Sequence, residues 1–95
     1  MSARALEELR AEIERVDREL IALMAQRHAI VREVGACKRA SGQAVLDPAR
    51  EAAVVARAGA LARDAGLPDD DVRALFRGLI ALSRRAQIDT RVATE

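Results

Sequence analysis

Residues 6–38 read LEELRAEIERVDRELIALMAQRHAIVREVGACK, and this stretch decides the fold. Apolar side chains recur along it at alternating steps of three and four residues, a heptad pattern that predicts an amphipathic helix. The pattern comprises Leu6, Leu9, Ile13, Val16, Leu20, Leu23, Ile30, Val34 and Cys37. No proline interrupts it and Gly35 is its single glycine, so we expect one helix from about residue 4 to about residue 40.

A helix of that length is long for the chain that contains it. At the usual rise per residue it extends roughly 50 Å. A globule of 95 residues has a radius of gyration of about 12–13 Å. The helix therefore extends beyond its own domain, and we expect a second copy of the chain to cover its apolar seam in a homodimer.

Two shorter helices are expected after the long one, because Ser41-Gly42-Gln43 breaks it. Asp47-Pro48 has the character of an N-cap and first helical position, so the second helix should run from about 48 to about 65, with Gly66 as its C-cap. Its inward side chains are expected to be Val54, Val55, Ala58 and Leu61.

The acidic run Asp69-Asp70-Asp71 suits the positive end of a helix dipole and predicts a third helix, from about 69 to about 89. Residues 91–95 are expected to fray. No stretch alternates as a strand does, so the sequence predicts an all-α fold with three helices in one domain, residues 1–95. The apolar set of the third helix is Val72, Leu75, Phe76, Leu79, Ile80 and Leu82.

The composition excludes several classes of function. The net charge of +1 gives no basic footprint for nucleic acid, and one Phe without Trp or Tyr provides no surface on which bases stack. A single Cys and a single His cannot form a disulfide framework or a structural zinc site. No apolar run approaches the ~20 residues that span a bilayer. We expect a cytoplasmic protein without a cofactor, a metal, a nucleic-acid partner or a membrane.

One position of the heptad seam holds Arg27, where an apolar side chain is expected. A guanidinium buried in a seam costs several kcal/mol unless an anion meets it. Lys38, the one lysine in the sequence, lies eleven residues further on. It returns to within about 20° of the same helix face, roughly 16 Å along the axis, so the two side chains can share one ligand. The pair predicts a small anion with two carboxylates. The alternative is that Arg27 reaches solvent or pairs with a Glu.

Further candidates are polar residues near the predicted helix ends and seam. Arg10 is roughly 25 Å from Arg27 along one helix, so it can serve the same ligand only from the partner chain; alone it resembles a surface arginine. Arg50 and Glu51 occupy the first turn of the second helix, where free backbone N–H groups bind anions. Glu51 also suits the ordinary role of a carboxylate that complements the helix dipole.

On the third helix, Ser83 and Gln87 form a polar pair four residues apart beside the apolar face. Such pairs are common on solvated helix surfaces. The neighbouring Arg84-Arg85 doublet is expected to be solvated, and Cys37 is expected to pack in the seam. No nucleophile, metal or acid–base pair accompanies these residues, so any reaction should depend on binding and electrostatics.

Four motifs in this order resemble those of the AroQ-type (all-helical) chorismate mutases. They are L-R-x-x-I-x-x-V-D-x-x-L-I-x-L-M-A-x-R (9–27), V-G-x-x-K (34–38), D-P-x-R-E (47–51) and L-F-x-x-L-I-x-x-S-x-x-x-Q (75–87). The match covers about residues 6 to 88. Each motif alone is weak, and the four in order at the family's spacing are specific. The resemblance implies an intertwined homodimer that converts chorismate to prephenate by a Claisen rearrangement.

The resemblance also implies roles for the candidate residues. Two arginines would hold the two carboxylates of the substrate: Arg27 and the partner subunit's Arg10. Lys38 and Gln87 would donate hydrogen bonds to the ether oxygen, where negative charge develops. The other matching positions would surround the ring hydroxyl or approach a carboxylate, and these are Asp47, Arg50, Glu51 and Ser83.

Other functions stay open at the level of the sequence. The same fold includes isochorismate–pyruvate lyases and mutases that act on 4-amino-4-deoxychorismate. The carboxylate of Glu51 favours chorismate over isochorismate, and it also suits the amino substrate. Some relatives are activated by the first enzyme of the aromatic pathway, so a regulatory complex with that enzyme is a further expectation. A non-catalytic dimerisation module would not need Arg27 in its seam, and a ligand-sensing domain would need an effector domain.

Overall fold

The structure, a computed structural model, describes residues 4–93, and the side chains of residues 4–88. It consists of three helices, α1 (Leu6–Ala40), α2 (Pro48–Asp64) and α3 (Asp69–Ala93), with no strand in the described part of the chain. The prediction of an all-α fold is therefore confirmed. Within residues 4–93 no helix is both long and apolar enough to cross a membrane.

Two helix ends differ from the prediction. α1 begins at Leu6 rather than near residue 4, and α3 continues to Ala93, beyond the expected end at Asp89. No glycine or proline follows Asp89, so nothing in the backbone stops the helix there. The expected fraying is wrong for residues 91–93, which are helical, and residues 94–95 lie outside the described residues.

Local sequence explains both ends of α2. Asp47 is its N-cap, as predicted: the side chain accepts a hydrogen bond from the backbone N of Arg50 at 3.1 Å. At the other end the C-cap is Ala65 rather than Gly66. Gly66 follows with a φ of +77°, a left-handed conformation that glycine adopts without strain and that ends the helix.

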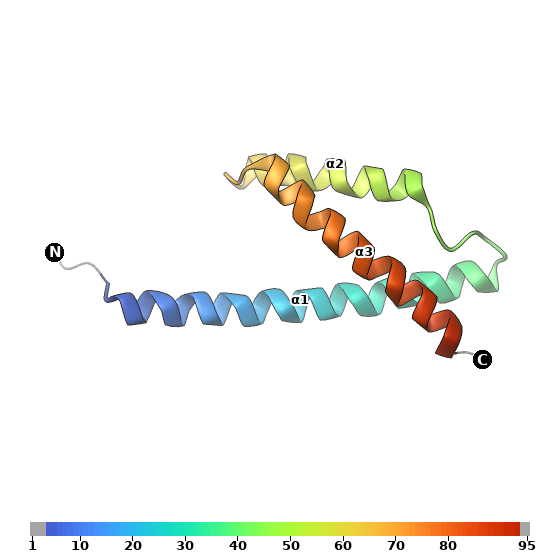
Figure 1. Ribbon diagram of the computed structural model, residues 1–95, viewed down its shortest axis with the longest axis horizontal. Helices are drawn as coiled ribbons and strands as arrows, with labels where there is room; N and C mark the ends of the chain where they lie inside the picture. Colours follow the sequence, from blue (N-terminus) through green and yellow to red (C-terminus); the bar gives the residue numbers. More distant parts are fainter. Residues whose placement is uncertain (1–3, 94–95) are drawn as a thin grey trace.

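The three helices form a bent, open arrangement (Figure 1). α3 packs against both α1 and α2, crossing the C-terminal half of α1, while the N-terminal end of α1 extends beyond the other two helices. The molecule measures 62 × 27 × 15 Å, and its radius of gyration is 17.3 Å. A globule of this length would have a radius of gyration of about 12–13 Å, so the single chain is far from globular.

Most of the residues buried between the helices are small. Gly35 of α1 is buried where α1 crosses α3, and a Cβ at this position would lie 3.3 Å from Cγ of Gln87. In α2 the buried face consists of small residues. Leu61 was expected to point inward, but it is 60% exposed because it lies outside the arc of the helix that Ala58, Gly59 and Ala62 occupy. The buried residues of α2 and α3 are Ala58, Gly59, Ala62, Ile80 and Ala86.

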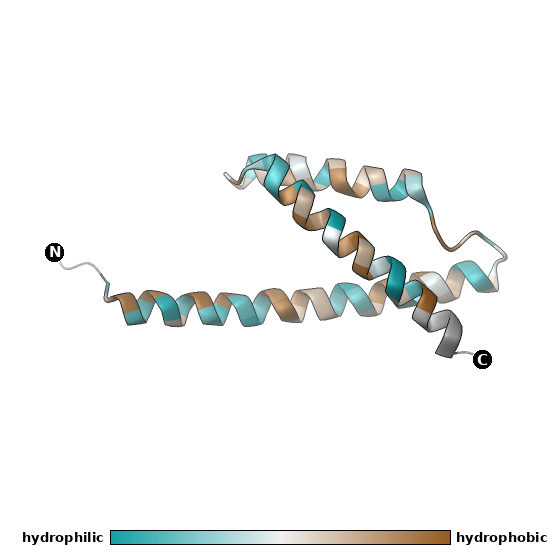
Figure 2. Cartoon of the chain, viewed as in Figure 1, coloured by the Kyte–Doolittle hydropathy of each residue, from teal (hydrophilic) through white to brown (hydrophobic). Residues whose placement is uncertain are grey.

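The apolar seam of α1 lies open in the single chain. Figure 2 shows hydrophobic bands recurring along the part of α1 that no other helix covers. Cys37, expected to pack in the seam, is exposed as well. A contiguous row of exposed apolar side chains is unusual on the surface of a monomeric protein. The exposed seam residues of this half are Leu6, Leu9, Ile13, Val16, Leu20 and Leu23.

Candidate functional site

A cavity of about 500 Å³ lies where the three helices face one another. Its volume is in the range of cavities that bind small molecules. The polar lining comes from all three helices and the segment before α2: Gln26, Arg27, Lys38, Asp47, Arg50, Glu51, Arg57, Ser83 and Gln87. The apolar lining is Leu23, Ile30, Val31, Val34, Val45, Val54 and Ile80.

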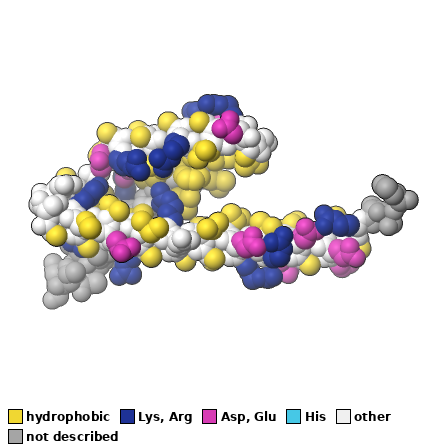
Figure 3. Space-filling view, turned by 180° about the vertical axis from the view of Figure 1, so that it is seen from behind, with side chains coloured by type: hydrophobic (Ala, Val, Ile, Leu, Met, Phe, Trp, Pro, Cys, Tyr) yellow, Lys and Arg dark blue, Asp and Glu magenta, His cyan; other side chains and the backbone are white. Residues whose placement is uncertain are grey.

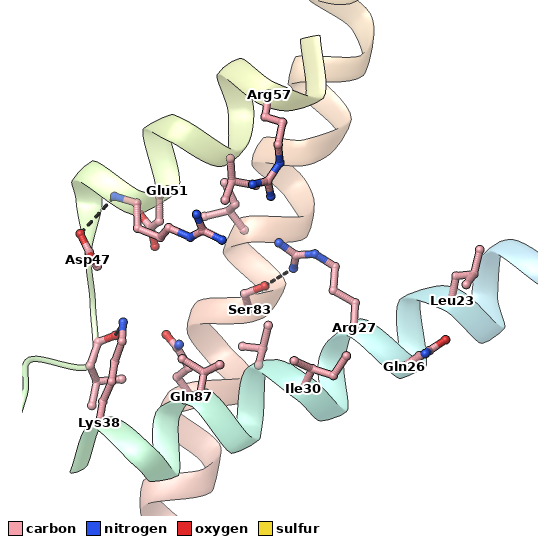
Figure 4. A pocket seen from close by; sticks show the side chains of 16 residues that line it. Leu23, Gln26, Arg27, Ile30, Lys38, Asp47, Glu51, Arg57, Ser83 and Gln87 are labelled. Atoms are coloured by element: carbon pink, nitrogen blue, oxygen red, sulfur yellow. Dashed lines mark hydrogen bonds between the residues drawn. The ribbon is translucent and has the colours of Figure 1, made fainter. Parts of the chain in front are cut away.

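Arg27 enters the cavity from α1 and is half-buried. Its Nη1 donates to Oγ of Ser83 at 2.5 Å, and that hydroxyl donates in turn to the backbone O of Leu79 at 2.9 Å (Figure 4). The serine thus orients one edge of the guanidinium. Among the described side chains Arg27 pairs with no carboxylate, so the alternative of a structural Arg–Glu pair is wrong. Its other N–H groups are available to an anion.

Lys38 lines the same cavity from the last turn of α1, as the helix geometry predicted. Its Nζ donates to the backbone O of Val45 at 3.2 Å, in the segment that returns from α1 to α2. An ammonium has three protons to donate, so two remain for a ligand. The backbone contact therefore fixes the ammonium near the cavity without consuming its capacity to donate.

Glu51 belongs to the first turn of α2 and makes a two-point ion pair with Arg84 of α3. Nε of Arg84 lies 2.9 Å from Oε2 of Glu51, and Nη2 lies 2.5 Å from Oε1. The hydrogen bonds from Arg84 hold the pKa of Glu51 below its ordinary value, and Glu51 raises the pKa of Arg84. Arg84 is exposed, as expected, and it also makes this ion pair, which the sequence reasoning did not predict. No local pattern could have revealed this pair, since its members are 33 residues apart.

Gln87 comes from α3, one turn beyond Ser83, and lines the cavity between α1 and α3. Its backbone O accepts a hydrogen bond from Nη1 of Arg39 at 3.4 Å, a contact that links the ends of the two helices. Figure 4 shows the amide of Gln87 on the same side of the cavity as Lys38. Two hydrogen-bond donors of different type therefore face one end of the cavity.

Arg57 is a cavity residue that the sequence reasoning missed. It lies seven residues after Arg50, two helical turns along the same face of α2, and this spacing was the available signal. Figure 4 shows its side chain reaching from α2 toward the side of the cavity where Arg27 enters from α1. Gln26 also lines the cavity and had no distinguishing signal.

The structure brings seven of the eight predicted residues to this cavity and leaves Arg10 outside it. Arg10 is exposed on the N-terminal half of α1. It precedes Arg27 by about 25 Å of helix, far beyond the reach of an arginine side chain. Within one chain, Arg10 cannot contact a ligand in the cavity.

The charge around the cavity is predominantly positive. Figure 3 shows Lys and Arg side chains gathered where α2 faces the C-terminal half of α1, whereas acidic and basic groups mix on the N-terminal half. Four cations face two carboxylates in the lining, and one of these carboxylates is already paired with Arg84. The arrangement suits a small ligand with two negative charges, because Arg forks bind carboxylates in pairs of hydrogen bonds.

Comparisons with known proteins identify a family that the chain matches. Residues 9–88 match the family model described as chorismate mutase type II. The chain is also similar to a protein named T-protein from Haemophilus influenzae, with 38% identity over 73 residues. That similarity covers 77% of this chain and 19% of the T-protein. The chain therefore spans about a fifth of the length of this relative.

Proposed function

Because the chain belongs to the chorismate mutase type II family, we propose that it catalyses the rearrangement of chorismate to prephenate in aromatic amino acid biosynthesis. The observation that carries the proposal is one cavity in which Arg27 and Lys38 are available to anions. The same cavity also holds the amide of Gln87, which can donate a hydrogen bond to a neutral ether oxygen, and the carboxylate of Glu51, which can accept one from a neutral hydroxyl.

The chemistry of the reaction matches what this cavity contains. The rearrangement breaks the ether C–O bond and forms a C–C bond within one molecule, so it needs no nucleophile and no electron acceptor. Its barrier falls when the substrate is held in the reactive conformer and the negative charge on the ether oxygen is stabilised. Fixed donors in a partly enclosed cavity provide both effects.

The cavity residues divide these tasks. Arg27, oriented by Ser83, would hold one carboxylate of chorismate through its free N–H groups. Lys38 and Gln87, at one end of the cavity, would donate to the ether oxygen as the C–O bond breaks. A compact ammonium suits a single atom that gains charge, and the amide adds a second donor without a second charge.

We propose in addition that the active molecule is a homodimer with shared sites. A second copy lying along α1 would cover the exposed seam and bring the partner subunit's Arg10 to the cavity. The open row of apolar side chains on the N-terminal half of α1 supports this arrangement. So does the distance of about 25 Å that separates Arg10 from Arg27 within one chain.

The proposal is tested by following the loss of chorismate absorbance in the ultraviolet. The sequence has no Trp or Tyr, so the protein contributes little background. The product must have the mass of the substrate, because a rearrangement neither adds nor removes atoms. A folded protein that leaves chorismate unchanged would show that the proposal is wrong.

A variant links the activity to the cavity. Lys38→Ala is expected to lower kcat by about 10²–10³, the usual effect of removing one donor to a developing oxyanion. The control is Arg18→Ala, which removes an exposed cation from the same helix, outside the cavity. Circular dichroism should show equal helicity in both. Full activity of Lys38→Ala would show that the role assigned to the Lys38 ammonium is wrong.

A carboxylate at Glu51 also permits a second substrate, 4-amino-4-deoxychorismate, whose ammonium would take the place of the ring hydroxyl. This analogue and isochorismate should be assayed beside chorismate. A lyase acting on isochorismate releases pyruvate, so the mass of the products distinguishes it from a mutase.

A further inference from the structure

Glu51 stands in the wall between two cavities. It lines the cavity of about 500 Å³ described above and a second one of about 370 Å³ between α2 and α3. Arg84 lines the second cavity and is absent from the lining of the first. Arg84 therefore reaches the Glu51 carboxylate from behind, on the side away from a ligand in the first cavity.

The proposed substrate defines what Glu51 can bind. Chorismate has two carboxylates and an ether oxygen, all of which accept hydrogen bonds, and one ring hydroxyl, which alone can donate. A carboxylate in the cavity is therefore complementary to the hydroxyl and to no other polar group of the substrate. It also carries the same charge as the two substrate carboxylates, and without compensation it would repel them.

We propose that Arg84 is a positioning residue that sets the substrate specificity of the cavity. By its two-point pair with Glu51, it makes this carboxylate a fixed acceptor for a neutral hydroxyl and a poor partner for an ammonium at the same place. The inference rests on the proposed function. It assigns Arg84 an effect on discrimination between the ring hydroxyl and a ring ammonium, although Arg84 itself touches no substrate.

The geometry supports both parts of this role. The guanidinium bonds both oxygens of Glu51, at 2.9 and 2.5 Å, so it fixes the plane of the carboxylate. Each oxygen retains acceptor capacity for a hydroxyl from the cavity side. The side chain of Glu51 is 21% exposed and that of Arg84 is 50% exposed, so the pair is partly screened by solvent and its two-point geometry, rather than burial, holds the carboxylate.

The other charged groups near Glu51 do not replace the effect of Arg84 on this carboxylate. The other groups that act on Glu51 are Lys38 from α1, which attracts its negative charge, and Asp47 at the N-cap, which opposes it. Arg50 and Arg57 also line the cavity, and among the described side chains neither forms an ion pair with Glu51. Arg84 has the largest effect in lowering the pKa of Glu51.

The test compares three variants on two substrates. Arg84→Met removes the charge and keeps an unbranched side chain, and Arg84→Lys keeps the charge and loses the fork. Arg85→Met is the matched control, because Arg85 is an exposed neighbour that lines neither cavity. For each protein, kcat/KM is measured with chorismate and with 4-amino-4-deoxychorismate.

The ratio of the two kcat/KM values carries the result. For Arg84→Met we expect it to move toward the amino substrate by roughly tenfold or more, the value of one charge-assisted hydrogen bond. Arg84→Lys should move it less, and Arg85→Met should leave it unchanged. In a Glu51→Gln background, Arg84→Met should cause no further change, because the effect of Arg84 passes through that carboxylate.

The pH profile gives an independent measurement. Without Arg84 the pKa of Glu51 rises toward its ordinary value, so the acidic limb of kcat/KM should move to higher pH. The carboxylates of chorismate titrate equally in every assay and cancel between variants.

Two outcomes are distinguished. If wild type is active and Arg84→Met or Arg84→Lys keeps both the substrate ratio and the acidic limb, the inference is overturned while the proposed function stands. Either variant alone can decide this, so failure of one to fold leaves the test intact. Folded wild type that converts neither substrate overturns the proposed function and the inference together.

Discussion

The sharing of sites between chains predicts complementation between two inactive variants. Arg10→Ala removes an arginine that would enter the cavity of the other chain, and Lys38→Ala removes a hydrogen-bond donor that lines the cavity of its own chain. Arg10 and Arg27 are separated by about 25 Å along one helix, so a cavity that needs Arg10 must take it from the other chain. Each variant alone should lose about 10²–10³ in kcat.

The expected recovery follows from the symmetry of the dimer. In a mixed dimer, one site combines the intact Lys38 of the Arg10→Ala chain with the intact Arg10 of the other chain, and the second site carries both defects. A purified heterodimer should therefore regain about half of the wild-type activity, and a random mixture about a quarter. Both values exceed the activity of either parent by more than about tenfold.

The assay needs dimers of known composition. Two different affinity tags and sequential purification isolate the heterodimer after the chains are unfolded and refolded together, and chorismate loss is then followed. Mixed wild-type chains carrying the same tags provide the reference. If verified heterodimers stay as inactive as the parents, or if Arg10→Ala alone is fully active, the shared-site reasoning is refuted.

Three further changes test the fold and its electrostatics. Leu20→Glu places a charge in the exposed seam, so the mass in solution should fall from twice the 10.3 kDa chain to that of one chain. The control Arg18→Glu, on the opposite face of the helix, should leave the mass unchanged. Light scattering after gel filtration measures both masses. Gly35→Ala puts a Cβ 3.3 Å from an α3 side chain of the cavity, so kcat should fall while the melting temperature holds. Its control, Gly78→Ala, meets open space and should gain about 0.5–1 kcal/mol with normal kcat. The pKa of Asp69 is lowered chiefly by a hydrogen bond from an arginine; its stabilising effect is present above the ordinary carboxyl pKa and is lost as pH falls through the lowered one. Asp69→Asn should accordingly lower the melting temperature at neutral pH, and the decrease of its melting temperature below the ordinary carboxyl pKa should be shallower than in wild type. A melting temperature equal to that of wild type at neutral pH would show that the pair does not stabilise the fold.

Features set by neighbours along the chain were predictable from the sequence. The heptad pattern of residues 6–38 determines that α1 is helical and long, because helical periodicity repeats within each turn. The same periodicity placed Arg27 and Lys38 on one face, where the structure has them lining one cavity. The Asp47 cap was also predictable, since its bond to the backbone N of Arg50 spans three residues.

Contacts between helices were not predictable in this way. Leu61 was expected to point inward, but α2 packs through small residues, and the sequence does not say which side of an alanine-rich helix meets its neighbour. Arg57 was missed because its role depends on the face that α2 turns toward α1. The roles of the cavity residues in catalysis remain predictions for the assays described above.

The sequence by itself determined the helices, the open seam of α1 and the cations along it, because each follows from spacing within a single helix. The tertiary structure alone decided that Arg84 stands behind Glu51 and that Gly35 lies against Gln87. The reason is geometric. Contacts across 33 and 52 residues depend on where and at what angle two helices cross, and that crossing is fixed by the packing of many side chains together.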